Sequence, residues 1–238
     1  MAVLRGEIID QLPVYVSCCR WALKEGIGAC LINNPEFGEK TYFQTEEEFS
    51  MFDISVCDTV KQTRAKVADP EFSVSVKIRI HDDLSRTVDL CRQMEAAGAN
   101  FITVHGRTRE QRGEPVNLSA IRSIKQSVSI PVVANGDIKS LGDVETTVAE
   151  TGCDGVMAAR GLLENPAMFA GHSETPDQCI IDWVRLALSS GTLFTCFHHH
   201  LIYMCEKRSS RADRKVFNAL ESSSAVIDYL RYNWNIQL

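Results

Sequence analysis

Short runs of β-branched and apolar residues alternate with helical spacing through the middle of the chain. The runs are 73–80, 101–105, 130–134 and 155–158. Between them, apolar residues recur three or four positions apart, as on one face of an amphipathic helix. These positions are Leu84, Val88, Cys91, Met94, Leu118, Ile121, Ile124, Val128, Leu141, Val144 and Val148. The alternation predicts βα units whose strands form a parallel sheet.

Turn and cap residues mark the ends of the predicted helices. Gly98 and Gly152 follow the first and third stretches, where a glycine commonly ends a helix. Asn117 stands just before the second stretch, and an asparagine there can cap the first helical turn. We therefore expect three separate helices between the four strands.

Polar or charged residues gather at the carboxyl end of each predicted strand. They are Lys77 and Arg79, His105 to Arg107, Asn135 to Asp137, and Ala159 to Gly161. Ligands bind at this edge of parallel α/β folds, and of barrels above all. A single Asn-Gly-Asp is most often only a turn. Four consecutive strand ends of this kind are hard to explain by packing, so they predict a binding site.

From about Thr175 onward, the apolar residues recur only at helical spacing. Three apolar stripes predict three helical stretches, made by Ile180, Val184, Ala187 and Leu188, by Phe194, Phe197, Leu201 and Met204, and by Val216, Phe217, Leu220, Val226 and Tyr229. By contrast, residues 37–57 show no regular period. We expect an α/β domain over 1–172 and a small helical domain over 173–238.

Composition narrows the class of protein. The chain has 238 residues, a formal net charge of -6, 45% hydrophobic and 24% charged residues, which is typical of a globular protein and excludes disordered, collagen-like and coiled-coil chains. No apolar run is long enough to span a membrane, and charges in the first twenty residues argue against a secretory signal. Nine cysteines without a C-x-x-C pair indicate free thiols in the cytoplasm. Three consecutive histidines, 198–200, lack the spacing of metal ligands, so we expect no metal.

One basic cluster lies in the helical region. It consists of Lys207, Arg208, Arg211, Arg214 and Lys215. Such a run is most often a solvated helix face, and the acidic net charge argues against a globally basic nucleic-acid binder. A local patch that binds phosphates is the alternative interpretation.

The predicted strand ends suit an anionic ring or phosphate ligand. Lys77 would place a fixed positive charge beside a flavin ring and stabilise its reduced form, although a lysine that reaches past the strand to solvent is the alternative. His105 could hydrogen-bond a phosphate or a ring. Backbone N–H groups after the last two strands could bind a phosphate, and Arg160 could add a charge-assisted hydrogen bond.

Several motifs together carry a resemblance to a known family. The segments VSVKIRIHDD, ITVHGRTREQR, IPVVANGDI and DGVMAARGLLENPAMF resemble the tRNA-dihydrouridine synthases. CFHHHLIYM and VFNALESSSAVIDYL are similar to the subfamily that acts at positions 20a and 20b of the D-loop. The resemblance implies an FMN-binding (β/α)8 TIM barrel followed by a helical tRNA-binding domain. It also implies reduction of the C5=C6 bond of uridine in tRNA, with NADPH as reductant and a cysteine as proton donor at C5.

The resemblance also implies roles for individual residues. Those for the flavin and its phosphate are Lys77, His105, Asn135, Gly136, Asp137, Ala159 and Arg160, with Ala159 standing where the family usually has glycine. Basic positions near the uridine and the tRNA are Arg79, Arg107 and Arg109. With tRNA as ligand, the cluster of Lys207, Arg208, Arg211, Arg214 and Lys215 is expected to bind the phosphate backbone.

Two departures from the family pattern concern the start of the chain. The Pro-Met flavin-binding turn and the first three strands are not found, so the chain opens near the fourth strand of a partial barrel with four or five βα units. The family's Asn-x-Gly-Cys-Pro motif corresponds to VYVSCCRWALKEG, where Ser17 takes the cysteine's place without a gap and Cys18 takes it after a slip of one residue. Cys18 is the predicted proton donor, with Cys19 as the fallback.

Half a barrel leaves open strand edges and removes one wall of the flavin site. We therefore expect this chain to bind FMN weakly or not at all and to have impaired activity. One alternative is a remnant without catalytic activity that acts as an RNA-binding module. Another is a fragment of an unrelated phosphate-binding barrel, which the combined motifs disfavour.

Overall fold

The computed structural model describes residues 2–4, 52–66 and 73–238. Ser17, Cys18 and Cys19 lie outside the described residues. The chain divides into two compact units, the first comprising 1–138 and 142–158 and the second 139–141 and 159–238. Each unit is described by itself. The functional domain boundary between residues 172 and 173 stays a prediction.

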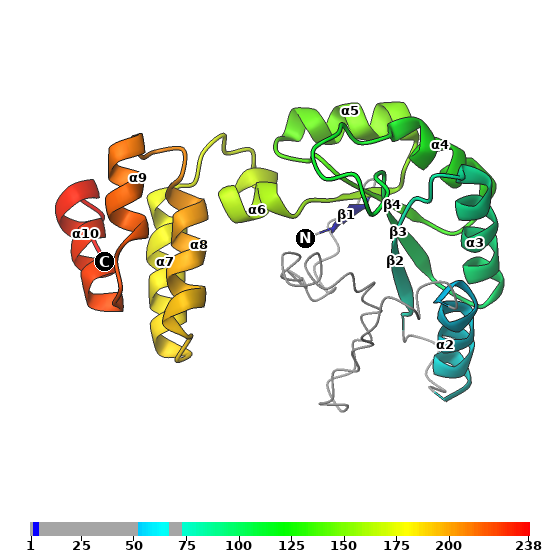
Figure 1. Ribbon diagram of the computed structural model, residues 1–238, viewed down its shortest axis with the longest axis horizontal. Helices are drawn as coiled ribbons and strands as arrows, with labels where there is room; N and C mark the ends of the chain where they lie inside the picture. Colours follow the sequence, from blue (N-terminus) through cyan, green and yellow to red (C-terminus); the bar gives the residue numbers. More distant parts are fainter. Residues whose placement is uncertain (1, 5–51, 67–72) are drawn as a thin grey trace. The chain divides into compact units, whose positions relative to one another are not determined.

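A five-stranded sheet forms the centre of the first unit (Figure 1). Its strands are β1 (Ala2–Leu4), β2 (Ser75–Arg79), β3 (Phe101–His105), β4 (Val132–Asn135) and β5 (Gly155–Met157), in the order β1-β5-β4-β3-β2. Strands β2 to β5 pair in parallel, which confirms the predicted partial barrel of βα units. Strand β1 pairs antiparallel with β5 and was not predicted, because three residues are too few for a periodic signal.

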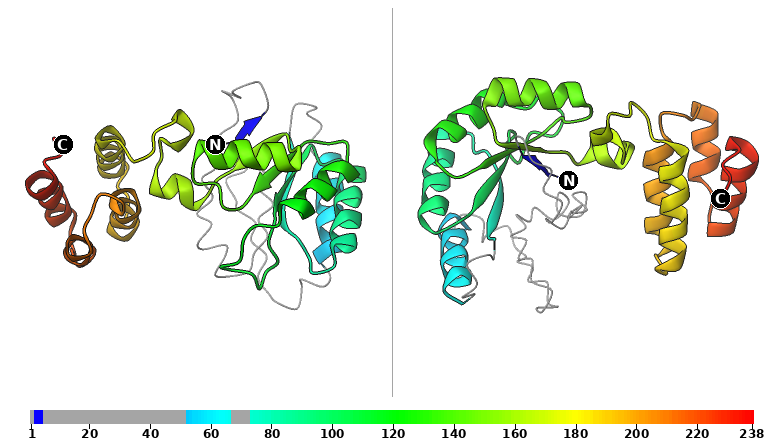
Figure 2. Two further views of the ribbon diagram at one scale, coloured as in Figure 1. Left: turned by 90° about the horizontal axis from the view of Figure 1, so that it is seen from above. Right: turned by 180° about the vertical axis from the view of Figure 1, so that it is seen from behind.

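Helices alternate with the parallel strands: α3 (Leu84–Ala96), α4 (Leu118–Ser127) and α5 (Leu141–Thr151). Helices α3 and α4 lie along one face of the sheet (Figure 1, Figure 2). The core between them and the strands consists of buried Val76, Ile102, Val104, Val132, Ala134, Val156, Leu90, Cys91, Met94, Ile121 and Ile124. The strand residues in this core alternate along each strand, because every second side chain points to the same face.

The helix ends follow the predicted cap residues. Asn117 accepts a hydrogen bond from the Ala120 N–H at 2.9 Å, which confirms it as the N-cap of α4. Gly98 and Gly152 have φ angles of +98° and +68°, so both end their helices in the left-handed conformation. Local sequence therefore determined where these helices begin and end.

Helix α2 (Phe52–Lys66) corrects the expectation for residues 52–57, the described part of the stretch 37–57 in which the sequence showed no regular period. It packs on α3, and its Val60 is fully buried. Arg64 donates a hydrogen bond from Nε to the Gly98 carbonyl at 2.9 Å, just beyond the end of α3. Tertiary packing thus stabilises a helix whose own pattern is weak.

The second unit is helical, with α6 (Arg160–Glu164), a short 3-10 helix (Met168–Ala170), α7 (Asp177–Ser189), α8 (Phe194–Cys205), α9 (Arg211–Asn218) and α10 (Ser223–Trp234). The third predicted stretch is therefore two helices. Ser222 caps α10 by accepting a hydrogen bond from the Ala225 N–H, and this cap separates α10 from α9. Leu188 and Val216, predicted on apolar stripes, are 52% and 54% exposed.

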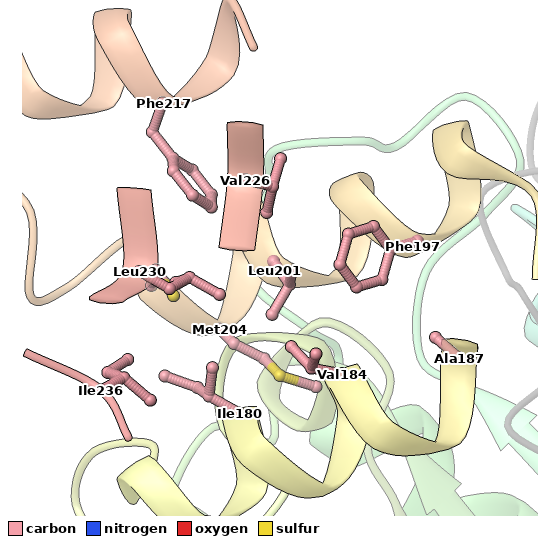
Figure 3. Packing of buried hydrophobic residues seen from close by; sticks show 11 residues of the cluster. Ile180, Val184, Ala187, Phe197, Leu201, Met204, Phe217, Val226, Leu230 and Ile236 are labelled. Atoms are coloured by element: carbon pink, nitrogen blue, oxygen red, sulfur yellow. The ribbon is translucent and has the colours of Figure 1, made fainter. Parts of the chain in front are cut away.

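One apolar cluster holds α7 to α10 together (Figure 3). Its members include Ile180, Val184, Phe197, Leu201, Met204, Phe217, Val226, Leu230 and Ile236. The Phe217 ring lies 4.7 Å from the Trp234 ring and 5.4 Å from the Tyr229 ring, between centroids. Among the described helices, none is long and apolar enough to cross a membrane.

Candidate functional site

A row of polar side chains crosses the carboxyl ends of the parallel strands. The sheet register pairs Arg79 with His105, His105 with Asn135, and Asn135 with Met157. Residues paired in register across parallel strands point to the same face of the sheet. Lys77 stands two residues before Arg79 and therefore shares this face. The structure thus brings Lys77, Arg79, His105 and Asn135 together on the face opposite to the one that packs on α3 and α4.

His105 is neutral in this setting. Burial is the largest cause that lowers the pKa of its imidazole, the positive charges of Arg79, Lys77 and Arg107 follow in that order, and Asp137 opposes them. Together these influences bring the pKa to about 3. A neutral imidazole donates one hydrogen bond and accepts another. His105 can therefore serve a ligand as donor or acceptor without adding charge.

The field around His105 is positive. Burial lowers the pKa of Arg79, and the charges of Arg107 and Arg112 lower it further, while Glu110 opposes them. An arginine stays charged despite such a shift. The clustered cations make this face suited to an anion or to a ring that carries negative charge.

The turn after β4 holds its neighbours by polar contacts. Asn135 donates from Nδ2 to the Met157 carbonyl at 2.8 Å, and its own carbonyl accepts the Gly106 N–H at 3.2 Å. These contacts join β4 to β5 and to the end of β3. Asp137 follows with a φ of +54°, a conformation that aspartate tolerates better than most residues. The ligand roles predicted for Asn135, Gly136 and Asp137 stay predictions.

The loop between β3 and α4 brings further cations to this edge. Arg79 donates from Nη1 to the Thr108 carbonyl at 2.8 Å, which fixes the start of the loop. Arg109 and Arg112 are exposed, whereas Arg107 is buried. Sequence reasoning missed Arg112, although its spacing from Arg109 in a short polar loop was a usable signal.

Ala159 and Arg160 belong to the second unit and follow β5 directly in the chain. Ala159 is the N-cap residue of α6 without a side-chain hydrogen bond, and Arg160 is exposed. Their predicted role at a phosphate therefore stays a prediction.

The predicted basic cluster spans the turn after α8 and the helix α9. Lys207, Arg208, Arg211 and Lys215 are exposed, and Arg214 is half-buried. Arg208 pairs with Asp177 at 2.6 Å, and Arg214 lies 3.9 Å from the Glu206 carboxylate. Asp213, the acidic residue within the run, forms a capping box with Ser210 at the start of α9. The cluster therefore presents cations at the surface of the second unit.

The three consecutive histidines lie within α8, and each contacts different residues. His198 is buried and lies 2.9 Å from the Phe217 carbonyl through Nε2. His199 packs edge-on against Tyr203, and His200 lies 4.7 Å from the Trp183 ring, between centroids. Within the described residues, no group of His, Cys, Asp and Glu could hold a metal ion.

Comparison with known proteins gives concordant results. The sequence model of the dihydrouridine synthase family matches residues 53–228. A mouse tRNA-dihydrouridine(20a/20b) synthase-like protein is 57% identical over 211 residues, covering 89% of this chain and 60% of the mouse protein. Its human counterpart is 56% identical over 217 residues, covering 91% and 63% respectively.

A more distant relative extends the same match. The tRNA-dihydrouridine(20a/20b) synthase of Schizosaccharomyces pombe is 39% identical over 231 residues, covering 96% of this chain and 65% of the yeast protein. The chain therefore spans less than two thirds of the length of these curated relatives. The family match covers most of the chain and includes the strand-end residues described above. By this match, the chain belongs to the dihydrouridine synthase family.

Proposed function

We propose that this protein takes part in the FMN-dependent reduction of uridine C5=C6 in the D-loop of tRNA, at positions of the 20a/20b type, with NADPH as reductant. The observation that carries this proposal is the positive face formed by Lys77 and Arg79 beside a neutral His105. Family membership and the names of the mouse, human and yeast relatives support the reaction and the positions.

The residues at the sheet edge fit a flavin. A reduced flavin ring carries negative charge, which nearby cations stabilise, and Lys77 and Arg79 supply such charges on one face. His105 offers a neutral donor or acceptor to a ring atom. When bound, FMN would supply the hydride for uridine C6. The family resemblance is the ground on which we also propose roles at its phosphate for Gly136, Ala159 and Arg160.

Protonation of uridine C5 requires an acid within hydrogen-bond reach of that carbon. We propose Cys18 for this role and Cys19 as the second candidate, because they are the thiols next to the family's cysteine position. The serine at position 17 has too high a pKa to serve as this acid.

Exposed cations would bind the tRNA backbone. Arg109 stands at the sheet edge near the proposed flavin, where it can meet the phosphates beside the target uridine. In the second unit, the exposed members of the basic cluster would neutralise further phosphates. The cysteine pattern of the sequence, which has no C-x-x-C pair, supports a reducing compartment, the cytoplasm.

A flavin titration tests the cofactor half of this proposal. We expect weak, saturable binding of FMN to the purified protein, measured by quenching of flavin fluorescence, because the described sheet supplies one side of a site. Lys77→Met should weaken this binding. Lys125→Met, which breaks an ion pair with Asp154 elsewhere in the same unit, should not.

Dihydrouridine formation tests the reaction itself. The protein is incubated with unmodified tRNA, FMN and NADPH, and the tRNA nucleosides are analysed by mass spectrometry. Dihydrouridine at positions 20a or 20b that disappears in Cys18→Ala supports the proposal. Binding of tRNA with no flavin binding and no dihydrouridine would overturn it and favour an RNA-binding module instead.

A further inference from the structure

The loop between β3 and α4 is seated on the turn after β4 by a close fit at two glycines. A Cβ atom added to Gly106 would lie 2.7 Å from Val116 Cγ2, and a Cβ added to Gly136 would lie at the same distance from the same methyl group. Val116 therefore occupies a notch that exists only because both neighbours lack side chains. The Asn117 N–H closes the loop by donating to the Gly106 carbonyl at 2.7 Å.

An ion pair between a buried arginine and a partly exposed aspartate lies beside this notch. The Arg107 guanidinium donates to the Asp137 carboxylate, and its Nε donates to the Glu114 carbonyl at the far end of the loop. The same Asp137 oxygen accepts the Val116 N–H at 3.2 Å. Two residues thus tie together both ends of the loop and the turn after β4.

Burial decides what Arg107 can do. Its side chain is only 5% exposed, whereas Arg109 and Arg112 in the same loop are exposed. A buried guanidinium needs a partner, and leaving it unpaired is strongly unfavourable. Arg107 is therefore directed into the protein. Its Nη1 also lies 3.5 Å from His105 Nε2, so the pair reaches the proposed flavin-facing histidine.

We propose that Arg107 and Asp137 are positioning residues: their ion pair clasps the β3–α4 loop onto the turn after β4, holds His105 in place, and contacts neither RNA nor cofactor. This inference rests on the proposed function for the role of His105. The segment between the clasped ends carries Arg109 and Arg112, which the clasp presents at the edge of the sheet.

Limited trypsin digestion of the full chain tests the clasp without any cofactor. Cleavage after Arg109 and Arg112 requires the loop to open, and its rate follows the population of the open form when opening is fast. Asp137→Asn keeps an acceptor for the Val116 N–H and tolerates the φ of +54°, so it removes the charge with little other change.

We expect Asp137→Asn and Arg107→Met to speed cleavage at these two bonds by about tenfold or more. The first variant leaves the buried Arg107 guanidinium without its carboxylate, and the second removes the guanidinium that joins both loop ends to Asp137. The matched control is Lys125→Met, since the Asp154 oxygen that pairs with Lys125 also accepts a backbone N–H, from Val132. The control should leave both cleavage rates unchanged. Equal rates in all four proteins would overturn the proposal.

Titration of the His105 ring by NMR separates positioning of the ring from a change in charge alone. Arg107 lowers the pKa of His105 and Asp137 raises it, alongside the lowering effects of Lys77 and Arg79. Loss of the Asp137 charge alone would therefore lower this pKa. If the pair holds His105 in place, Asp137→Asn should instead raise the pKa toward its ordinary value, because the released ring loses burial, which is the largest lowering influence. A pKa that stays low in Asp137→Asn would overturn the positioning role.

The salt dependence of tRNA binding tests the statement that Arg107 makes no RNA contact. Loss of one phosphate contact lowers the slope of log affinity against log salt by about one. Arg107→Met should leave this slope unchanged, and a drop by about one would overturn the proposal. Digestion and NMR need neither flavin nor turnover. Failure of the proposed function and failure of the clasp would therefore be told apart.

Discussion

Different kinds of contact stabilise the sheet edge of the first unit and the helical second unit, each within itself. At the sheet edge, polar groups make the contacts, including the Arg107–Asp137 pair and the Asn135 bond to Met157. In the second unit, apolar and aromatic side chains make the core, and the cations stay at the surface. Charged groups thus take part in the packing at the sheet edge, whereas in the second unit they lie outside the apolar core.

A half-buried histidine, His105, and a buried one, His198, show the same contrast. Burial lowers the pKa of both His105 and His198. Around His105 the remaining influences are mostly cations, whereas His198 stacks on Phe194, meets the edge of Phe217 and bonds to a backbone carbonyl. One neutral imidazole therefore lies among cations at the sheet edge, and the other fills a packed core.

The largest expected effect comes from breaking the aromatic core of the second unit. Phe217→Ala removes a fully buried ring that contacts Trp234 and Tyr229, so we expect the free energy of unfolding to fall by about 3–5 kcal/mol. Urea denaturation followed by circular dichroism measures this. Its neighbour Val216 is exposed, and Val216→Ala should change stability by about 0.5 kcal/mol or less. Similar losses in the two variants would contradict the described core.

The glycine notch at the sheet edge should be the next most sensitive feature. Gly136→Ala places a methyl group against Val116 at a φ of +129°, and overpacking alone costs about 1–3 kcal/mol. Gly113→Ala, in the β3–α4 loop that carries Val116, has open space around the added atom, so it is the control and should cost little. Both are measured by thermal unfolding. An unchanged midpoint for Gly136→Ala would mean that Val116 does not fill the notch.

The pH dependence of stability should carry the signature of His105. Its pKa is about 3 in the folded chain and 6.5 ordinarily, so between these values only the unfolded chain binds the proton. Stability then rises with pH across this window, by at most about 1.4 kcal/mol per unit from this group, and is lost as pH falls toward 3. His105→Gln should remove that slope in urea midpoints measured from about pH 4 to about pH 6.5. An unchanged slope would show that His105 is accessible to protons.

The smallest effect on stability is expected at the surface of the second unit. Lys215 is exposed, so Lys215→Ala should change the free energy of unfolding by no more than about 0.5 kcal/mol. In tRNA binding, however, it should reduce the salt slope by about one, measured by filter binding or fluorescence anisotropy. Lys125→Ala, whose ammonium pairs with Asp154, serves as the comparison and should keep the slope. Equal slopes in all three proteins would exclude Lys215 from RNA contact.

The sequence predicted where most residues of the candidate site lie, but it did not show which of them are buried and which are exposed. The strand-end positions of Lys77, His105 and Asn135 followed from the βα rhythm, because parallel strands end at one edge. Arg107 and Arg109 looked alike in sequence, yet one is buried and the other exposed. Their difference depends on Asp137, thirty positions further along the chain.

Sequence by itself determined the four parallel strands, the helices between them, their caps and the helical character of the second unit. These features depend on periods and cap residues within a few positions of one another. Only the tertiary structure decided that β1 joins the sheet, that 52–66 form a helix on α3, and that Arg107 turns inward to Asp137. Each of these depends on a partner far away in the chain, because a short strand, a weak helix and a buried charge are stable only against the groups that pair with them.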